Sequence, residues 1–220
     1  MEPLSVTQEF VLCALKEDGK IPLLRATEVT VCLVSSAVWE LIYHHAVRYD
    51  EKDDLVCEGA LPEQAAYLQP LYEQIKEREP VSVHKLVESY VYAATEKDLQ
   101  QLIEAIGTKL EEVQCGEVVL ERGLLHEKVR FHPDQAAVQQ VVDKVRDEFF
   151  SEKVLSNNIV ALTALLEESG LLKQYFSKYE TDTLRQRLKE LSNVDEYAFV
   201  AGMMDATETL IELIEASGVK

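Results

Sequence analysis

The chain has 220 residues, of which 47% are hydrophobic, so it is long enough to bury one sizeable core or two small ones. It carries 22 basic and 40 acidic side chains, which gives a formal net charge of −18. Such a surface repels nucleic acid, because protein affinity for nucleic acid comes largely from Lys and Arg. It also repels anionic lipid unless the basic residues gather on one face. We therefore exclude nucleic acid as a partner.

The cysteines and the first residues indicate a protein of the cytoplasm. The four cysteines have neither metal-ligand spacing nor a C-x-x-C motif, and we expect free thiols at Cys13, Cys32, Cys57 and Cys115. The first residues, 1–3, contain no basic region and no apolar run of signal type. Between Glu28 and Glu40 lie about eleven largely apolar residues, which we expect to be too few to span a bilayer.

The first predicted element is a helix that begins after Ser5. Ser5 and Gln8 have the spacing of a capping box, in which each side chain bonds the other residue's backbone amide. The apolar residues that follow fall on one helical stripe as far as Leu15. The pair Asp18-Gly19 then predicts a turn.

The second predicted element is a helix from Thr27 to about Tyr43. Its β-branched residues would suit a strand, but its length and continuous apolarity favour a helix that is buried on most sides. The small residues at 35–37 would let neighbouring helices approach closely. We therefore expect this helix at the centre of the molecule, with Trp39 buried.

The next segments predict a hairpin and two helices. Residues 47–57 read as a short β-hairpin with a polar turn. A helix is expected from Pro62 to about Glu77, kinked or split at Pro70, which cannot donate a backbone hydrogen bond. Ser82 is placed to cap the helix after it.

The clearest helical periodicity begins at Thr95, and we expect one helix from there to Arg122, stopped by Gly123. The segment 124–131 is then expected to form a second small hairpin with basic residues. Four further helices are predicted at 134–149, 157–168, 181–191 and 194–216, the last with a capping box between Asn193 and Glu196. The sequence thus predicts one mainly α domain over residues 1–220, a helical bundle around a buried central helix with small β-hairpins.

No motif in the chain carries catalytic chemistry. There is no G-x-S-x-G nucleophile turn, no phosphate-binding glycine loop and no H-E-x-x-H. His44 and His45 are adjacent and point about 100° apart on a helix, so they cannot chelate one metal together. His126 and His132 would share a face of an extended strand, but no third ligand accompanies them. We expect neither an enzyme nor a metal or cofactor.

The few basic residues are grouped in two places. Lys128 and Arg130 alternate after Gly123, and three further basic residues lie close together in the segment 184–191. Each group could form a cationic binding patch. The alternative is that each pairs with nearby acids, which are abundant in this chain.

Five segments, in this order and spacing, resemble the Golgi phosphoprotein 3-like family. They are LSVTQEFVLCALKEDGKI at 4–21, the apolar helix ending in WELI at 39–42, LERGLL at 120–125, SNNIVALTALLEESGLLKQYF at 156–176 and LRQRLKEL at 184–191. The resemblance covers residues 4 to about 191. It implies a mainly helical, non-enzymatic, peripheral membrane protein, and the eukaryotic relatives recognise phosphatidylinositol 4-phosphate.

The resemblance also implies where a lipid head group would bind. Four family positions, a Trp and three Arg, correspond in this chain to Arg25, Val34, Lys109 and Glu112. Only two of these are cations, and Glu112 would repel a phosphate. We therefore expect weak binding of anionic lipid by a patch of Arg25, Lys109, Lys128 and Arg130, with Phe131 as the residue that inserts into the membrane.

Two alternatives to this function remain open. The chain could be a soluble protein-interaction module that kept the fold and lost the lipid pocket, in line with its net charge of −18. A winged-helix regulator is the other, because a helix followed by Gly and a basic hairpin resembles a wing, but its recognition helix would be acidic. The sequence identifies no protein partner and leaves the oligomeric state open.

Overall fold

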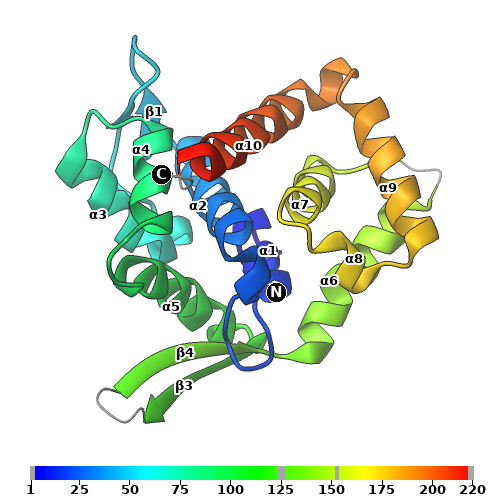
Figure 1. Cartoon of the computed structure of the whole chain (residues 1–220), viewed down its shortest axis with the longest axis horizontal. Helices are drawn as coiled ribbons and strands as arrows, with labels where there is room; N and C mark the ends of the chain where they lie inside the picture. Colours follow the sequence, from blue (N-terminus) through cyan, green and yellow to red (C-terminus); the bar gives the residue numbers. More distant parts are fainter. Residues whose placement is uncertain (1–2, 123–126, 152–153, 218–220) are drawn as a thin grey trace.

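The structure is a computed structural model that describes residues 3–122, 127–151 and 154–217. It is 67% helical and has two small antiparallel two-stranded sheets, which confirms the mainly α class (Figure 1). In chain order the elements are α1 (Val6–Ala14), η1 (Leu23–Arg25), α2 (Ala26–Tyr43), β1 (Val47–Tyr49), β2 (Leu55–Cys57), η2 (Glu63–Leu68), α3 (Gln69–Arg78), α4 (Val83–Val91), α5 (Lys97–Glu112), β3 (Gly116–Arg122), β4 (Glu127–Pro133), α6 (Gln135–Phe149), α7 (Asn157–Glu168), α8 (Leu172–Tyr175), α9 (Lys178–Leu191), η3 (Asp195–Tyr197) and α10 (Ala198–Ser217).

Helix α2 forms the centre of the molecule, as the sequence predicts. Helices α1, α4, α7 and α10 pack around it (Figure 1). Every residue from Val29 to Val38 is buried, because a helix that is apolar on all sides must be covered on all sides. The small side chains Ser35, Ser36 and Ala37 are buried in this stretch and let neighbouring helices approach closely.

The expectation that Trp39 is buried is wrong, and the apolar segment of α2 is longer than expected. Trp39 is only half-buried, because the last turns of α2 are less closely covered than its middle. The segment Leu23–Tyr43 has 21 residues and a hydropathy of 1.3, so by length and composition it could cross a bilayer. Of its apolar window, 67% is buried within the fold, as in the core helix of a soluble protein.

Helix α1 begins with the predicted capping box. The Gln8 amide donates to Oγ of Ser5 (3.2 Å), and the Ser5 amide donates to Oε1 of Gln8 (2.9 Å). All residues from Thr7 to Ala14 are buried, because α2, α5, α6 and α7 contact this short helix from several sides.

The first hairpin and the helices after it follow the prediction closely. β1 and β2 pair with Val47 opposite Cys57, and Pro70 separates η2 from α3 by lying in the first turn of α3. The Lys85 amide donates to Oγ of Ser82, which therefore caps α4 as expected.

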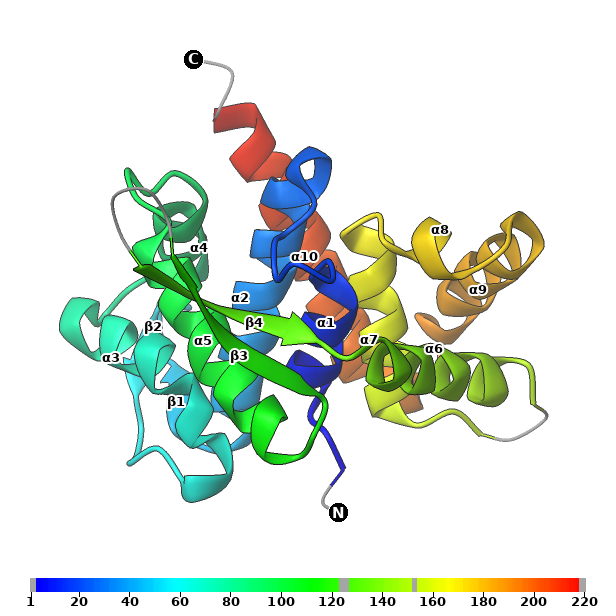
Figure 2. The ribbon, with the colours of Figure 1, turned by 90° about the horizontal axis from the view of Figure 1, so that it is seen from below.

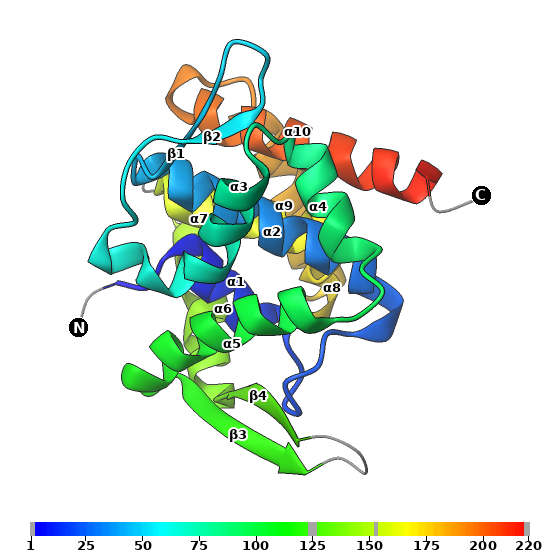
Figure 3. The same ribbon diagram turned by 90° about the vertical axis from the view of Figure 1, so that its left-hand side faces the viewer.

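The long helix expected from Thr95 to Arg122 is wrong in its last third. Helix α5 ends at Glu112, and Gln114 adopts a left-handed conformation with φ +62°. The chain then forms β3, which pairs with β4 from Gly116 opposite Pro133 to Arg122 opposite Glu127. The hairpin lies along α5 (Figure 2), at the end of the molecule opposite β1 and β2 (Figure 3). Residues 123–126, where the second hairpin was expected to begin, lie outside the described residues.

Helices α6 to α9 form the other side of the molecule (Figure 1). α6 and α7 begin where expected, with caps from Asp134 and Ser156, whereas the short helix α8 was not predicted. The capping box expected at Asn193 is absent, because the Asn193 side chain instead donates to the carbonyl of Lys189 (2.9 Å).

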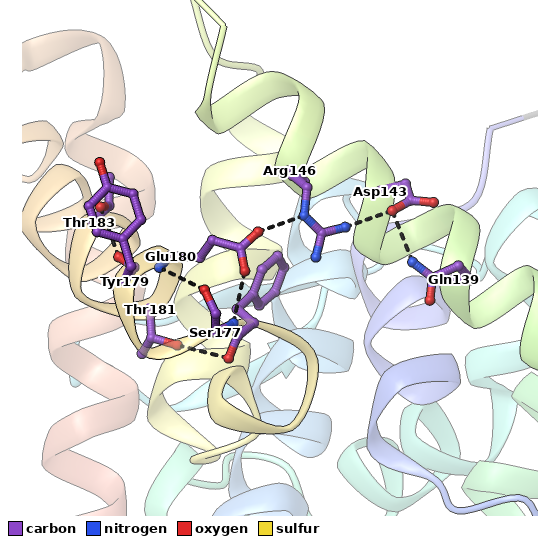
Figure 4. Close-up of polar contacts among 9 residues, drawn as sticks. Gln139, Asp143, Arg146, Ser177, Tyr179, Glu180, Thr181 and Thr183 are labelled. Carbon is purple, nitrogen blue, oxygen red and sulfur yellow. Dashed lines mark hydrogen bonds and ion pairs between the residues drawn. The ribbon is translucent and has the colours of Figure 1, made fainter.

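An ion-pair network joins α6 to the start of α9 (Figure 4). The guanidinium of Arg146 contacts Glu180 (2.7 Å) and Asp143 (2.7 Å) and lies 5.4 Å from the centre of the Phe176 ring. The Glu180 carboxylate also accepts a hydrogen bond from the Ser177 backbone amide (2.8 Å), as part of the capping box at the start of α9. Through this network α6 and α9 are tied together by their polar side chains.

Candidate functional site

One groove lies between the β3–β4 hairpin, the first half of α5 and the segment that connects α1 to α2. We call it the hairpin groove, and its volume is about 240 Å³. The residues that line it are Gly19, Lys20, Ile21, Leu23, Ala26, Thr30, Glu96, Leu99, Gln100, Ile103, Glu104, Val129, Arg130 and Phe131. The groove therefore brings the opening segment of the chain against the basic hairpin.

A tight turn at Gly19 holds the connecting segment against β4. Gly19 has φ +68°, and a Cβ there would lie 2.4 Å from the carbonyl oxygen of Phe131. The Gly19 amide donates to the Lys16 carbonyl (2.8 Å), and the Lys16 amide donates to the Lys20 carbonyl (3.0 Å). The turn thus fixes Lys20 at the edge of the groove, where its ammonium lies 2.6 Å from Asp18.

Phe131 lies in the core, so the expectation that it inserts into a membrane is wrong. Its side chain is fully buried. A Cβ at Gly107 of α5 would lie 2.4 Å from Phe131 Cβ, and one at Gly116 of β3 would lie 2.5 Å from the ring. These two glycines leave the space between α5 and the hairpin that the ring fills.

Arg25 and Lys109 do not line the hairpin groove. The guanidinium of Arg25 pairs with Glu28 (2.8 Å), and a Cβ at Gly170 would lie 2.9 Å from it, so Arg25 covers the turn after α7. Lys109 pairs with Glu112 one turn along α5 (2.7 Å). The cations that the family resemblance points to are therefore apart from the groove.

Lys128 and Arg130 both lie on β4, but in different surroundings. Arg130 lines the groove and pairs with Glu121 of β3 (2.9 Å), so its charge is largely neutralised. Lys128 is exposed. Val34, at the second family position, is fully buried in α2 and cannot contact a head group.

Two exposed leucines beside the groove were missed by the sequence reading. Leu23 and Leu24 of η1 are 87% and 92% exposed, and Leu23 also lines the hairpin groove. The only signal in the sequence is their position, directly after Pro22 and before the continuous apolar run of α2. An exposed pair of leucines at the rim of a groove is a typical feature of a membrane or protein contact.

A second groove lies where α1 and α7 begin, beside the last turns of α2 and the first turns of α10. We call it the aromatic groove, and its volume is about 380 Å³. The residues that line it are Ser5, Val6, Thr7, Ser36, Trp39, Glu40, Tyr43, His44, Asn157, Asn158, Ala161, Phe199, Val200 and Met203. No sequence pattern predicted it, because its residues come from four separate helices.

A carboxylate is held in place at the aromatic groove. The Tyr67 hydroxyl of η2 donates to Oε1 of Glu40 and lies 2.9 Å from Oγ of Ser5. Burial and the adjacent Glu40 carboxylate raise the pKa of Tyr67 far above its usual value, so this phenol stays a donor at physiological pH. Tyr67 therefore positions Glu40.

A cluster of carboxylates lies between α7 and α10. Burial, followed by the nearby charges of Glu208, Glu167 and Asp205, raises the pKa of Glu168 to about 7. Glu167 is itself paired with Arg185 of α9 (2.5 Å). The basic segment at 184–191 thus forms at least one of the acid pairs that were the alternative to a binding patch.

Metal ligands do not gather among the described residues, where no group of three His, Cys, Asp or Glu side chains could hold an ion. His45 is 86% exposed at the end of α2, as expected, and lies 3.7 Å from Glu58. His132 lies 3.5 Å from Glu121, and His126 is outside the described residues. The described cysteines are free thiols.

The comparison with family models decides the family. The model of Golgi phosphoprotein 3 (GPP34) matches residues 6–216, nearly the whole chain. The chain belongs to the Golgi phosphoprotein 3 family. Golgi phosphoprotein 3 proteins are in general not enzymes. No individual curated protein matches the sequence significantly.

Proposed function

We propose that this member of the Golgi phosphoprotein 3 family binds peripherally, and weakly, to anionic membrane surfaces from the cytoplasm. The observation that carries the proposal is the exposed pair Leu23 and Leu24 at the rim of the hairpin groove, which Arg130 of β4 also lines. Leucines enter the apolar part of a bilayer, and cations contact its anionic head groups.

The energies favour the leucines over the charges as the main source of affinity. A leucine contributes about 1.5–3 kcal/mol when fully buried, and less when it is inserted in part. A basic residue close to an anionic membrane contributes about 1 kcal/mol. The ion pairs of Lys20 with Asp18 and of Arg130 with Glu121 offset most of their attraction, and Lys128, the other cation of β4, is exposed.

We also propose little preference for phosphatidylinositol 4-phosphate over other anionic lipids. A selective head-group site needs several converging cations to meet a phosphate monoester. Among the described residues, the hairpin groove is lined by two cations, Lys20 and Arg130, together with Glu96 and Glu104. The two positive and two negative side chains that line the groove therefore balance, which leaves no net positive charge to select a phosphate monoester.

Co-sedimentation with vesicles tests this function. The vesicles contain phosphatidylcholine alone, or with added phosphatidylserine or phosphatidylinositol 4-phosphate at equal total charge. We expect a small bound fraction that rises with either anionic lipid and falls at high salt. The double variant Leu23→Ser, Leu24→Ser is expected to lose about tenfold in binding. Leu213→Ser, which changes a half-exposed leucine of α10, is the matched control and is expected to bind as the natural protein does.

A soluble protein-interaction module is the second candidate, and the ion pairs favour it. Arg25, Lys109 and Arg130 each have a carboxylate within 3 Å, as a protein that no longer binds lipid would have. If the natural protein stays in the supernatant with every vesicle at low salt, membrane binding is rejected and this candidate stands.

A further inference from the structure

The aromatic groove contains a carboxylate oxygen that has no partner. Glu40 receives the Tyr67 hydroxyl on Oε1, whereas Oε2 is buried and accepts no hydrogen bond from any described residue. Thr7, which is 1% exposed and lines the same groove, also has a hydroxyl oxygen without a partner. Buried polar groups are normally paired, and each unpaired one costs free energy. Both residues belong to the lining of one groove, so a small side-chain rotation would let an occupant of the groove supply the missing polar contacts.

The charge of the groove favours a cation as that occupant. Among the described residues that line it, Glu40 is the only Asp, Glu, Lys or Arg, and it takes part in no ion pair of the described structure. An anion would face this carboxylate with no Lys or Arg beside it, and His44 is the one imidazole among the described lining residues. A bound cation would supply the positive charge that the Glu40 carboxylate lacks.

The walls of the groove suit a cation with an apolar body. Trp39, Tyr43 and Phe199 are three aromatic side chains from α2 and α10, and Tyr43 and Phe199 are 75% and 64% exposed. Aromatic faces attract ammonium groups through their quadrupole. Val200 and Met203 add apolar surface. The volume of about 380 Å³ is typical of a small-molecule site.

We propose that the aromatic groove binds an organic cation, a substituted ammonium group attached to an apolar body. The ammonium lies at Glu40, which Tyr67 holds in position, and the apolar body packs among Trp39, Tyr43 and Phe199. No bond is made or broken, so this is a binding site and not a catalytic one.

The site is separate from the membrane contact proposed above. Ala26 and Thr30, in the first turns of α2, line the hairpin groove, and the aromatic groove begins at Ser36. From Thr30 to Glu40 the helix rises about 15 Å. Changes at Glu40 are therefore expected to leave binding to anionic vesicles made without phosphatidylcholine unchanged, which keeps failure of one proposal distinguishable from failure of the other.

Trp39 makes the test direct, because it is the only tryptophan in the chain and lies in the groove. Its fluorescence is followed while the full chain is titrated with 2-phenylethylammonium, with phenyltrimethylammonium and with the neutral 2-phenylethanol. We expect both cations to change the emission with saturation, and the neutral alcohol to bind about tenfold more weakly or not at all. Glu40→Gln is expected to weaken the cations about tenfold and to leave the alcohol unaffected, whereas the exposed control Glu51→Gln changes neither.

Phe199→Ala keeps the test decisive if Glu40→Gln does not fold. Phe199 is 64% exposed, so its removal is expected to leave folding intact and to weaken cation binding several-fold. Equal binding of the cations and the alcohol overturns the proposal, as does cation binding that neither variant weakens, or an absence of any response.

Phosphatidylcholine vesicles, titrated in the same way, distinguish a lipid head group from a free small molecule. A Glu40-dependent response to them, in the Leu23→Ser, Leu24→Ser background, assigns the cation to a lipid head group, and a response to the soluble ammonium ions alone assigns it to a free small molecule.

Discussion

Glu168 shows how a single side chain makes the stability of this fold depend on pH. It lies at the end of α7, facing Asp205 and Glu208 of α10, while its neighbour Glu167 is paired with Arg185. Burial and these carboxylates raise its pKa from about 4.5 in an unfolded chain to about 7. The folded chain therefore holds this proton more tightly than the unfolded chain. The contribution favours folding below pH 4.5 and is lost as the pH rises through 7.

Glu168→Gln is expected to remove this dependence. At pH 8 the variant should be more stable than the natural protein by about 1 kcal/mol, after allowance for the solvent screening of a partly exposed group. At pH 4, where Glu168 is protonated in both states, the two should unfold alike. Urea unfolding followed by circular dichroism at pH 4, 6 and 8 measures the difference.

Glu212→Gln, at an exposed position of α10, is the control for general charge removal. An equal gain for this control at pH 8 would mean that net charge, and not the position of Glu168, is responsible. A Glu168→Gln variant that is less stable at pH 8 would contradict the assignment of the raised pKa to this carboxylate.

At the scale of elements, polar contacts join helix α6 to helix α9. Glu180 accepts hydrogen bonds from Arg146 and from Ser177 (Figure 4), and these lower its pKa to about 2. A carboxyl whose pKa falls on folding stabilises the fold above its unfolded value of about 4.5, and this contribution is lost as the pH falls towards 2.

Glu180→Gln tests the link between α6 and α9. Gln keeps the capping box with Ser177 but loses the charge that meets Arg146, so we expect a loss of about 0.5–1 kcal/mol in the free energy of unfolding at pH 7. Near pH 2 most of the difference should be lost, because Glu180 is then about half protonated in the folded chain and almost fully protonated in the unfolded chain. A loss of equal size at both pH values would show that shape, rather than charge, matters at this contact.

The boundaries of elements show where local patterns mislead. Capping at Ser5 and Ser82 was predicted from the sequence, because a cap involves residues only three positions apart. The end of α5 was not, because Glu112 is followed by a segment whose apolar residues continue a helical spacing. Pairing with β4 and packing against α5 turned that segment into a strand.

At the scale of the whole molecule, the net charge of −18 repels anions and attracts cations that approach Trp39, the only tryptophan. Trp39 is half-buried and faces a groove that holds Glu40. We expect iodide to quench its fluorescence poorly at low salt and better as sodium chloride screens the charge, because repulsion fades beyond a Debye length of about 10 Å at 0.1 M. Caesium should show the opposite salt dependence.

Acrylamide, which is neutral, is the control for this measurement, and its quenching of Trp39 should not change with salt. A Trp39 that acrylamide cannot reach would mean that the residue is buried, as the sequence alone suggested. Iodide quenching that is independent of salt would show that the charge is screened locally at the groove.

The sequence by itself determined the mainly α class, the central helix α2, most helix starts and the family. These depend on periodicity, on caps and on the order of segments, all of which are local in the chain. That residues 1–220 form a single domain stays a prediction. Only the tertiary structure decided that Phe131 fills the space between Gly107 and Gly116, that Leu23 and Leu24 stay exposed, and that Glu40 meets Tyr67 but no cation. Each of these depends on contacts between segments far apart in sequence, and burial and charge pairing at such contacts follow from how the helices pack.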